Sequence, residues 1–70
     1  MQVYERIRDY MEDHALKQGA IAKRAGISPQ TMSAMLHGRR KLYADELAGI
    51  CRALGVGAGE FIEADEAMEN

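Results

Sequence analysis

The sequence predicts an all-α fold: one compact domain of five helices with a helix-turn-helix near its middle. Apolar residues recur at spacings of three and four positions, as one face of a helix requires. The periodic segments end at Gly26, Gly38 and Gly55. Glycine is favoured there because the residue after a helix often takes the left-handed conformation, which costs glycine least.

Composition limits how this domain can be stabilised. The chain has 70 residues and one cysteine, so we expect a single domain with no internal disulfide. Its Cys and His residues lack metal-ligand spacing, and neither a long apolar run nor a signal-peptide pattern is present. The sequence therefore predicts an apolar core, no metal, no cofactor, no small-molecule ligand, no membrane association and a cytoplasmic location.

The first two helices are expected to depend on apolar packing, and the first is expected to serve as scaffold. Over residues 2–14 the apolar side chains recur at helical spacing: Val3, Ile7, Tyr10 and Met11. Over residues 17–25, Lys17 is a poor N-cap and Gly19 weakens the first turn. Packing by Ile21, Ala22 and Ala25 must therefore hold the second helix.

The third helix is predicted over about residues 28–37. Ser28 stands where an N-cap belongs, because its hydroxyl can accept a hydrogen bond from an unsatisfied backbone N–H group. Pro29 follows at the first helical position, where its missing N–H has no cost. The turn between the second and third helices is Ala25-Gly26-Ile27-Ser28.

Two faces are expected on this third helix. At 100° per residue, the apolar face holds Met32, Met35 and Leu36. The opposite face is small and polar, without an acidic group, and holds Gln30, Ser33, Ala34 and His37. Such a face suits a DNA major groove, where Gln bonds adenine and small side chains permit close approach. An ordinary solvated helix face is the alternative interpretation.

The distribution of charge favours a nucleic-acid partner, although the net charge is −2. All eleven acidic residues lie in the segments 5–13 and 45–69. The window between them is purely basic and contains Lys17, Lys23, Arg24, Arg39, Arg40 and Lys41. Phosphate binding responds to the local field and not to the total charge. A solvated basic surface is the alternative.

The remaining segments complete the predicted core. Residues 44–54 form the fourth helix, with Asp45 and Glu46 at its positive end and Cys51 as a small core residue without an activating base. A short fifth helix is expected over residues 58–62, weakened by Gly57 and Gly59. Residues 63–70 form a separate acidic C-terminal tail that should point away from DNA.

The chain resembles the Cro/Xre (lambda-repressor-like) transcriptional regulators over about residues 3–62. The positions that carry the resemblance are Leu16-Lys17-Gln18, Ile21-Ala22, Ala25-Gly26-Ile27-Ser28, Met32, Met35, Gly38, Leu47, Ile50, Leu54-Gly55-Val56 and Phe61. The resemblance implies a helix-turn-helix DNA-binding domain over residues 1–62, with its third helix in the major groove. It also implies a bacterial or phage-encoded regulator that binds a near-palindromic operator as a homodimer.

The same resemblance, together with the faces of the third helix and the basic loop after it, indicates which residues should bind DNA. The base-reading set is Gln30, Thr31, Ser33, Ala34 and Pro29. The set expected to bind phosphates is Gln18, Lys17, Ser28, His37, Arg39, Arg40, Lys41 and Tyr43. The candidates for a dimer surface are Val56, Phe61 and Ile62.

The chain departs from the family pattern where relatives often pair an Arg on the first helix with a Glu late in the third. The corresponding residues are Met11 and Leu36, which we expect to make an apolar contact instead. Some relatives act as antitoxins or adaptors, so a protein-interaction module on the same fold is the alternative function. An enzyme is not expected, because no nucleophile with a base, paired carboxylates or phosphate-binding glycine loop is visible.

Overall fold

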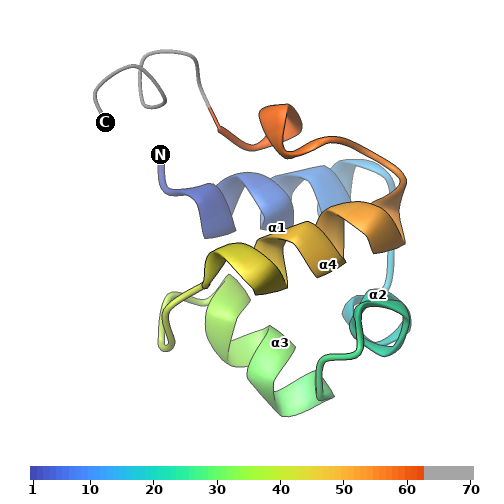
Figure 1. The fold of residues 1–70 in the computed structure, drawn as a ribbon, viewed down its shortest axis with the longest axis vertical. Helices are drawn as coiled ribbons and strands as arrows, with labels where there is room; N and C mark the ends of the chain where they lie inside the picture. Colours follow the sequence, from blue (N-terminus) through green and yellow to red (C-terminus); the bar gives the residue numbers. More distant parts are fainter. Residues whose placement is uncertain (63–70) are drawn as a thin grey trace.

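A computed structural model describes residues 1–62, and the acidic tail predicted over residues 63–70 lies outside this part. Within it the chain forms four α-helices and one short 3-10 helix (Figure 1). In chain order these are α1 (Val3–Asp13), α2 (Gln18–Ala25), α3 (Pro29–Leu36), α4 (Ala44–Leu54) and η1 (Ala58–Glu60). The all-helical fold class is confirmed. The first four predicted helices differ from the observed α-helices only by residues at their ends.

The predicted fifth α-helix is instead the three-residue 3-10 helix η1. Gly57 precedes it and provides no side chain to cap its first N–H groups. Gly59 lies inside it and lowers its helical propensity. The count of five α-helices is therefore not reached in the described part of the chain.

All four α-helices end in the same way, with a left-handed residue just past the helix. Gly26, Gly38 and Gly55 have φ between 72° and 76°, as their positions in the sequence predicted, while Ala15 ends α1 with φ 54°. The next amide in each case donates to the carbonyl five residues earlier: Leu16 to Met11, Ile27 to Ala22, Arg39 to Ala34 and Val56 to Cys51. Each pattern is a Schellman motif, which satisfies helix carbonyls that would otherwise lack a partner.

The core is apolar throughout. It contains Ile7, Met11, Ile21, Ala22, Met32, Met35, Leu36, Ile50, Cys51 and Phe61, and no buried polar or charged residue occurs between residues 1 and 62. Met11 and Leu36 are both members, at 2% and 0% exposure, so apolar core side chains occupy the positions where relatives often have an ion pair.

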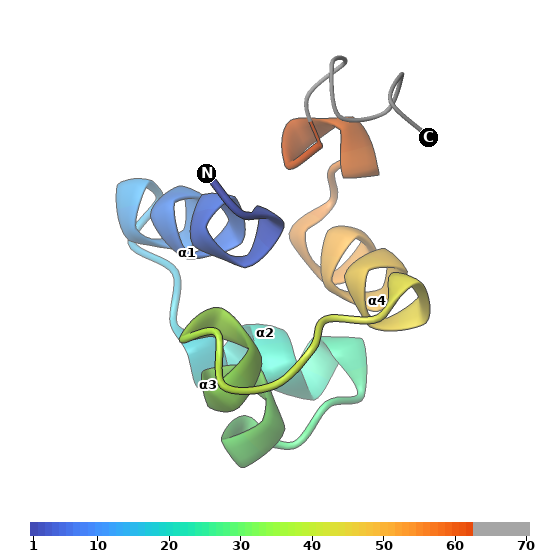
Figure 2. The same ribbon diagram turned by 90° about the vertical axis from the view of Figure 1, so that its left-hand side faces the viewer.

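The helices form two levels. In Figure 2, α1 and α4 lie apart in the upper part, and α2 and α3 close the lower part. α2 packs mainly against α4 and α3, and α1 reaches α3 from the other side. α1 and α2 therefore both pack against α3. Within residues 1–62, no helix combines the length and apolar character needed to span a bilayer.

Candidate nucleic-acid interface

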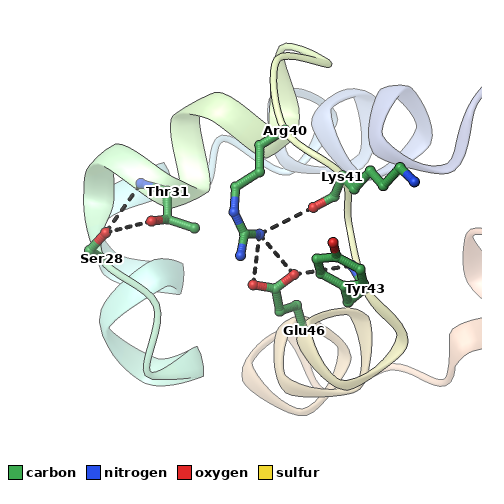
Figure 3. Close-up of polar contacts among 6 residues, drawn as sticks. All are labelled: Ser28, Thr31, Arg40, Lys41, Tyr43 and Glu46. Atoms are coloured by element: carbon green, nitrogen blue, oxygen red, sulfur yellow. Dashed lines mark hydrogen bonds and ion pairs between the residues drawn. The ribbon is translucent and has the colours of Figure 1, made fainter.

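The first turn of α3 is closed by Ser28. Its Oγ accepts a hydrogen bond from the backbone N–H of Thr31 at 3.2 Å and lies 2.9 Å from the Thr31 hydroxyl (Figure 3). The predicted N-cap is confirmed. The Ser28 hydroxyl is therefore already engaged within the turn. A contact between Ser28 and a phosphate stays a prediction.

The predicted division of α3 into two faces is also confirmed. Met32, Met35 and Leu36 are fully buried. The opposite side is open to solvent: Pro29, Gln30 and His37 are exposed, and Thr31, Ser33 and Ala34 are partly exposed. No acidic residue lies on this helix. α3 therefore presents a small, uncharged surface whose position is set by its apolar side.

His37 follows α3 and is oriented by it. Its Nδ1 lies 2.8 Å from the carbonyl oxygen of Ser33. A carbonyl only accepts, so Nδ1 carries the proton and donates. Nε2 makes no hydrogen bond with residues 1–62, and it can donate one only when the ring is doubly protonated.

The start of α2 has the properties of a phosphate-binding helix end. Lys17 occupies the N-cap position but makes no side-chain cap hydrogen bond. The first helical amides have no acceptor within the helix, so they give this end a positive partial charge. Gln18 is half-buried at this end, while Gly19 and Ala20 are exposed and leave room for close approach.

Arg40 is held within the protein by α4. Its Nη1 lies 2.9 and 2.8 Å from the two carboxylate oxygens of Glu46 and 3.1 Å from the carbonyl oxygen of Lys41 (Figure 3). Its guanidinium also lies 5.7 Å from the ring centroid of Tyr43. The hydrogen bond to Glu46 raises the pKa of Arg40 above its ordinary value. Arg40 thus ties the loop to the start of α4.

Glu46 serves two groups at once. Besides Arg40, it accepts a hydrogen bond from the backbone N–H of Tyr43 at 3.0 Å and so caps the first turn of α4. The hydrogen bond from Arg40, and then that from Tyr43, hold the pKa of Glu46 below its ordinary value. The sequence placed Glu46 at the positive end of α4 but did not indicate its pairing with Arg40.

The other two cations of the loop, Arg39 and Lys41, differ from Arg40. The side chains of Arg39 and Lys41 are exposed, and neither makes a hydrogen bond or ion pair with a residue in the range 1–62. Tyr43 is 58% exposed. These three side chains are therefore exposed to solvent, which a phosphate contact would require.

A cleft of about 360 Å³ separates the turn of the helix-turn-helix from the start of α4. Its lining comes from both sides: Ala25, Gly26, Ile27, Ser28, Thr31, Arg40, Asp45 and Glu46. The window free of acids in the sequence is therefore bordered in space by two carboxylates. On the side of this cleft, the carboxylates of Asp45 and Glu46 therefore limit how far the basic surface extends.

The dimer candidates separate into two kinds. Phe61 is 1% exposed and makes an edge-to-face contact with Tyr10, with ring centroids 5.6 Å apart. It belongs to the core of this chain, so its assignment to a dimer surface is corrected: burial leaves it nothing to offer a partner. Val56 and Ile62 are half-buried and keep some apolar surface.

Cys51 lies in the core at 5% exposure, and burial raises the pKa of its thiol. Both observations agree with a packing role. Across the described residues, no group of three or more His, Cys, Asp or Glu side chains is arranged to hold a metal ion.

Comparison with known proteins identifies the family. Residues 6–67 match the family model for the Cro/C1-type HTH DNA-binding domain. No curated protein and no solved structure matches the chain. The matched region includes α2, the turn and α3, which form the helix-turn-helix described above. The chain belongs to the Cro/C1-type HTH DNA-binding domain family.

Proposed function

We propose that this protein is a sequence-specific transcriptional regulator whose α3 reads the major groove of double-stranded DNA. The observation that supports this most is the outward face of α3, which is exposed and free of acidic groups while Met32, Met35 and Leu36 are fully buried behind it. A helix held rigidly from one side presents its other side at a defined distance from the bases.

Base reading is assigned to the first half of that face. Gln30 is exposed near the start of α3, where recognition helices of this kind contact base edges. Its amide can bond adenine through two hydrogen bonds. Ala34, one turn further, is small enough to contact a thymine methyl group.

Phosphate binding is assigned to two places on either side of α3. One is the uncapped start of α2 with Gln18, and the other is the loop with Arg39 and Lys41. Contacts to phosphates fix the register of the protein on DNA but carry no sequence information. His37 and Tyr43 would add donors near the loop.

A homodimer on a near-palindromic operator is part of the proposal. Two copies would place their α3 helices in successive major grooves, about 34–36 Å apart. Val56 and Ile62 are the candidates for the contact between copies, because they are half-buried apolar residues that precede and follow η1. Sedimentation of the free protein and of its DNA complex tests this arrangement.

The decisive experiment is selection of bound fragments from random DNA, followed by two matched substitutions. Gln30→Ala should weaken binding to the selected operator by about 1–3 kcal/mol and leave binding to random DNA nearly unchanged. Gln18→Ala removes the same side chain from the phosphate-binding helix end, so it should weaken both DNAs alike.

An equal loss on both DNAs for Gln30→Ala would exclude base reading by this residue. Failure of the wild-type chain to retard any DNA at low salt would exclude the proposed function. The protein-interaction module would then be the better hypothesis.

A further inference from the structure

A pair of residues on α1 holds the C-terminal end of α3 outside the core. The Nη1 of Arg8 donates to the carbonyl oxygen of Leu36 at 2.9 Å. The guanidinium of Arg8 lies 6.0 Å from the ring centroid of Tyr4, one turn earlier on α1. The Tyr4 ring covers Gly38 so closely that a Cβ there would lie 2.6 Å from the phenol oxygen. We call Tyr4 and Arg8 the α1 clamp.

The hydrogen bonds at the end of α3 show what the clamp supplies. The last four carbonyls of a helix lack partners within it. Three of those in α3 are satisfied locally, because the amides of His37, Gly38 and Arg39 donate to Ser33, Met35 and Ala34 respectively. The fourth belongs to Leu36, and Arg8 satisfies it. The clamp therefore completes the end of α3.

The distribution of basic residues at the helix ends also indicates that Arg8 completes the end of α3. α2 carries Lys23 and Arg24 in its last turn and α4 carries Arg52, whereas α3 has no basic residue there. The carbonyl end of a helix is partly negative and would repel a phosphate. Arg8 brings a cation to this end from another helix, beside the residues that lead into the basic loop.

We propose that Arg8 is a positioning residue for DNA binding. Through Leu36 and Gly38, the α1 clamp fixes the direction in which the chain leaves α3 and so places Arg39 against the phosphate strand. This inference rests on the proposed function. It adds α1, which the sequence indicated only as scaffold, to the elements that determine affinity.

The test is a double-mutant cycle with Arg8→Met and Arg39→Ala, measured on the selected operator. Arg8→Met should weaken binding about ten-fold, the effect of one lost hydrogen bond from a charged donor. In the Arg39→Ala background the same change should cost no more than about two-fold, because Arg8 acts through Arg39. Arg8→Lys keeps the cation and should restore most of the affinity.

Arg6→Met is the matched control. It removes the same charge from the same helix, but the hydrogen bond of Arg6 goes to the carbonyl oxygen of Phe61, at the end of η1. Its effect on affinity should stay within about two-fold, because a charge that does not contact DNA acts only through the long-range field, which salt screens. Circular dichroism at the binding temperature confirms that each variant is folded. If Arg8→Met does not fold, Arg8→Gln, which removes the charge, replaces it in the cycle, and its loss of affinity should likewise fall to no more than about two-fold in the Arg39→Ala background.

The outcomes separate the two proposals. A wild-type chain that binds no DNA overturns the proposed function and this inference together. A wild-type chain that binds, with Arg8→Met equal to Arg6→Met, overturns this inference alone. A loss of affinity for Arg8→Met that is the same in the wild-type and Arg39→Ala backgrounds also overturns this inference alone.

Discussion

Arg39 and Arg40 are neighbours of the same residue type on one loop, yet the fold gives them different surroundings. Arg40 turns back to α4, where its guanidinium contacts both oxygens of Glu46. The Arg39 side chain is exposed and makes no hydrogen bond or ion pair within the described part of the chain. A phosphate that approaches Arg40 must compete with a carboxylate, whereas one that approaches Arg39 need not.

The contrast shows why a count of cations overstates a basic surface. The sequence places three adjacent cations after α3, but their availability depends on the carboxylates that the fold brings near them. The left-handed turn at Gly38 and the capped start of α4 determine those distances. Four predictions test this account.

Gly38→Ala should change the protein most, because it disturbs the turn that sends Arg39 and Arg40 in different directions. A side chain there must adopt φ near 73° and displace the Tyr4 ring. The expected loss is about 3 kcal/mol of unfolding free energy, from the left-handed conformation and overpacking together. Urea unfolding measures it.

Gly55→Ala is the control for this prediction. Gly55 has a similar φ of 76°, but nothing lies within 4 Å of the place for its Cβ. It should lose only about 1 kcal/mol, the cost of the backbone conformation. Equal losses at the two positions would mean that the contact with Tyr4 is unimportant.

Arg39→Ala and Arg40→Ala should affect DNA binding unequally. Removing Arg39 should weaken all sequences alike and reduce the slope of log affinity against log salt by about 1. Removing Arg40 should change this slope less and reduce the stability of the fold instead, because its partner is Glu46. The measurement is a salt titration with each variant. Equal slopes for the two variants would show that DNA draws Arg40 away from Glu46, as its assignment to the phosphate-binding set requires.

Acid should remove the interaction that distinguishes Arg40. The pKa of Glu46 is lower in the folded protein than in the unfolded chain, so its pairing stabilises the fold above the unfolded value, about 4.3. This contribution is lost as pH falls through the lower, folded value. Unfolding experiments from neutral to acid pH should therefore show wild type more stable than Glu46→Gln near pH 7, with the difference vanishing in acid. A difference that is independent of pH would contradict the pairing.

Ala15→Gly should have the smallest effect and serves as a reference for the other variants. Ala15 is the non-glycine residue with positive φ in the described chain, at 54°. Glycine removes that strain but adds entropy to the unfolded state, so we expect a net gain of about 0.5 kcal/mol. Thermal unfolding measures the gain.

A feature of this protein could be predicted from the sequence when the residues that form it are close together along the chain. The cap at Ser28, the glycines at helix ends and the buried face of α3 depend on residues within one or two turns, and the sequence predicted them correctly. The short fifth helix predicted over residues 58–62 is only a three-residue 3-10 helix, as the weakening by Gly57 and Gly59 suggested. The role of Phe61 was misassigned, because periodicity shows that a residue is apolar but not whether its own chain covers it.

By itself, then, the sequence determined the family, the helices and the side of α3 that faces outward. Those features depend on spacing, capping and turn conformation, which act over a few residues. Tertiary structure alone decided which cations remain available and what completes the end of α3. Arg40 meets Glu46 six positions later, and Arg8 meets Leu36 across 28 positions. Contacts of this kind form only after the helices have packed, so no local pattern of residues contains them.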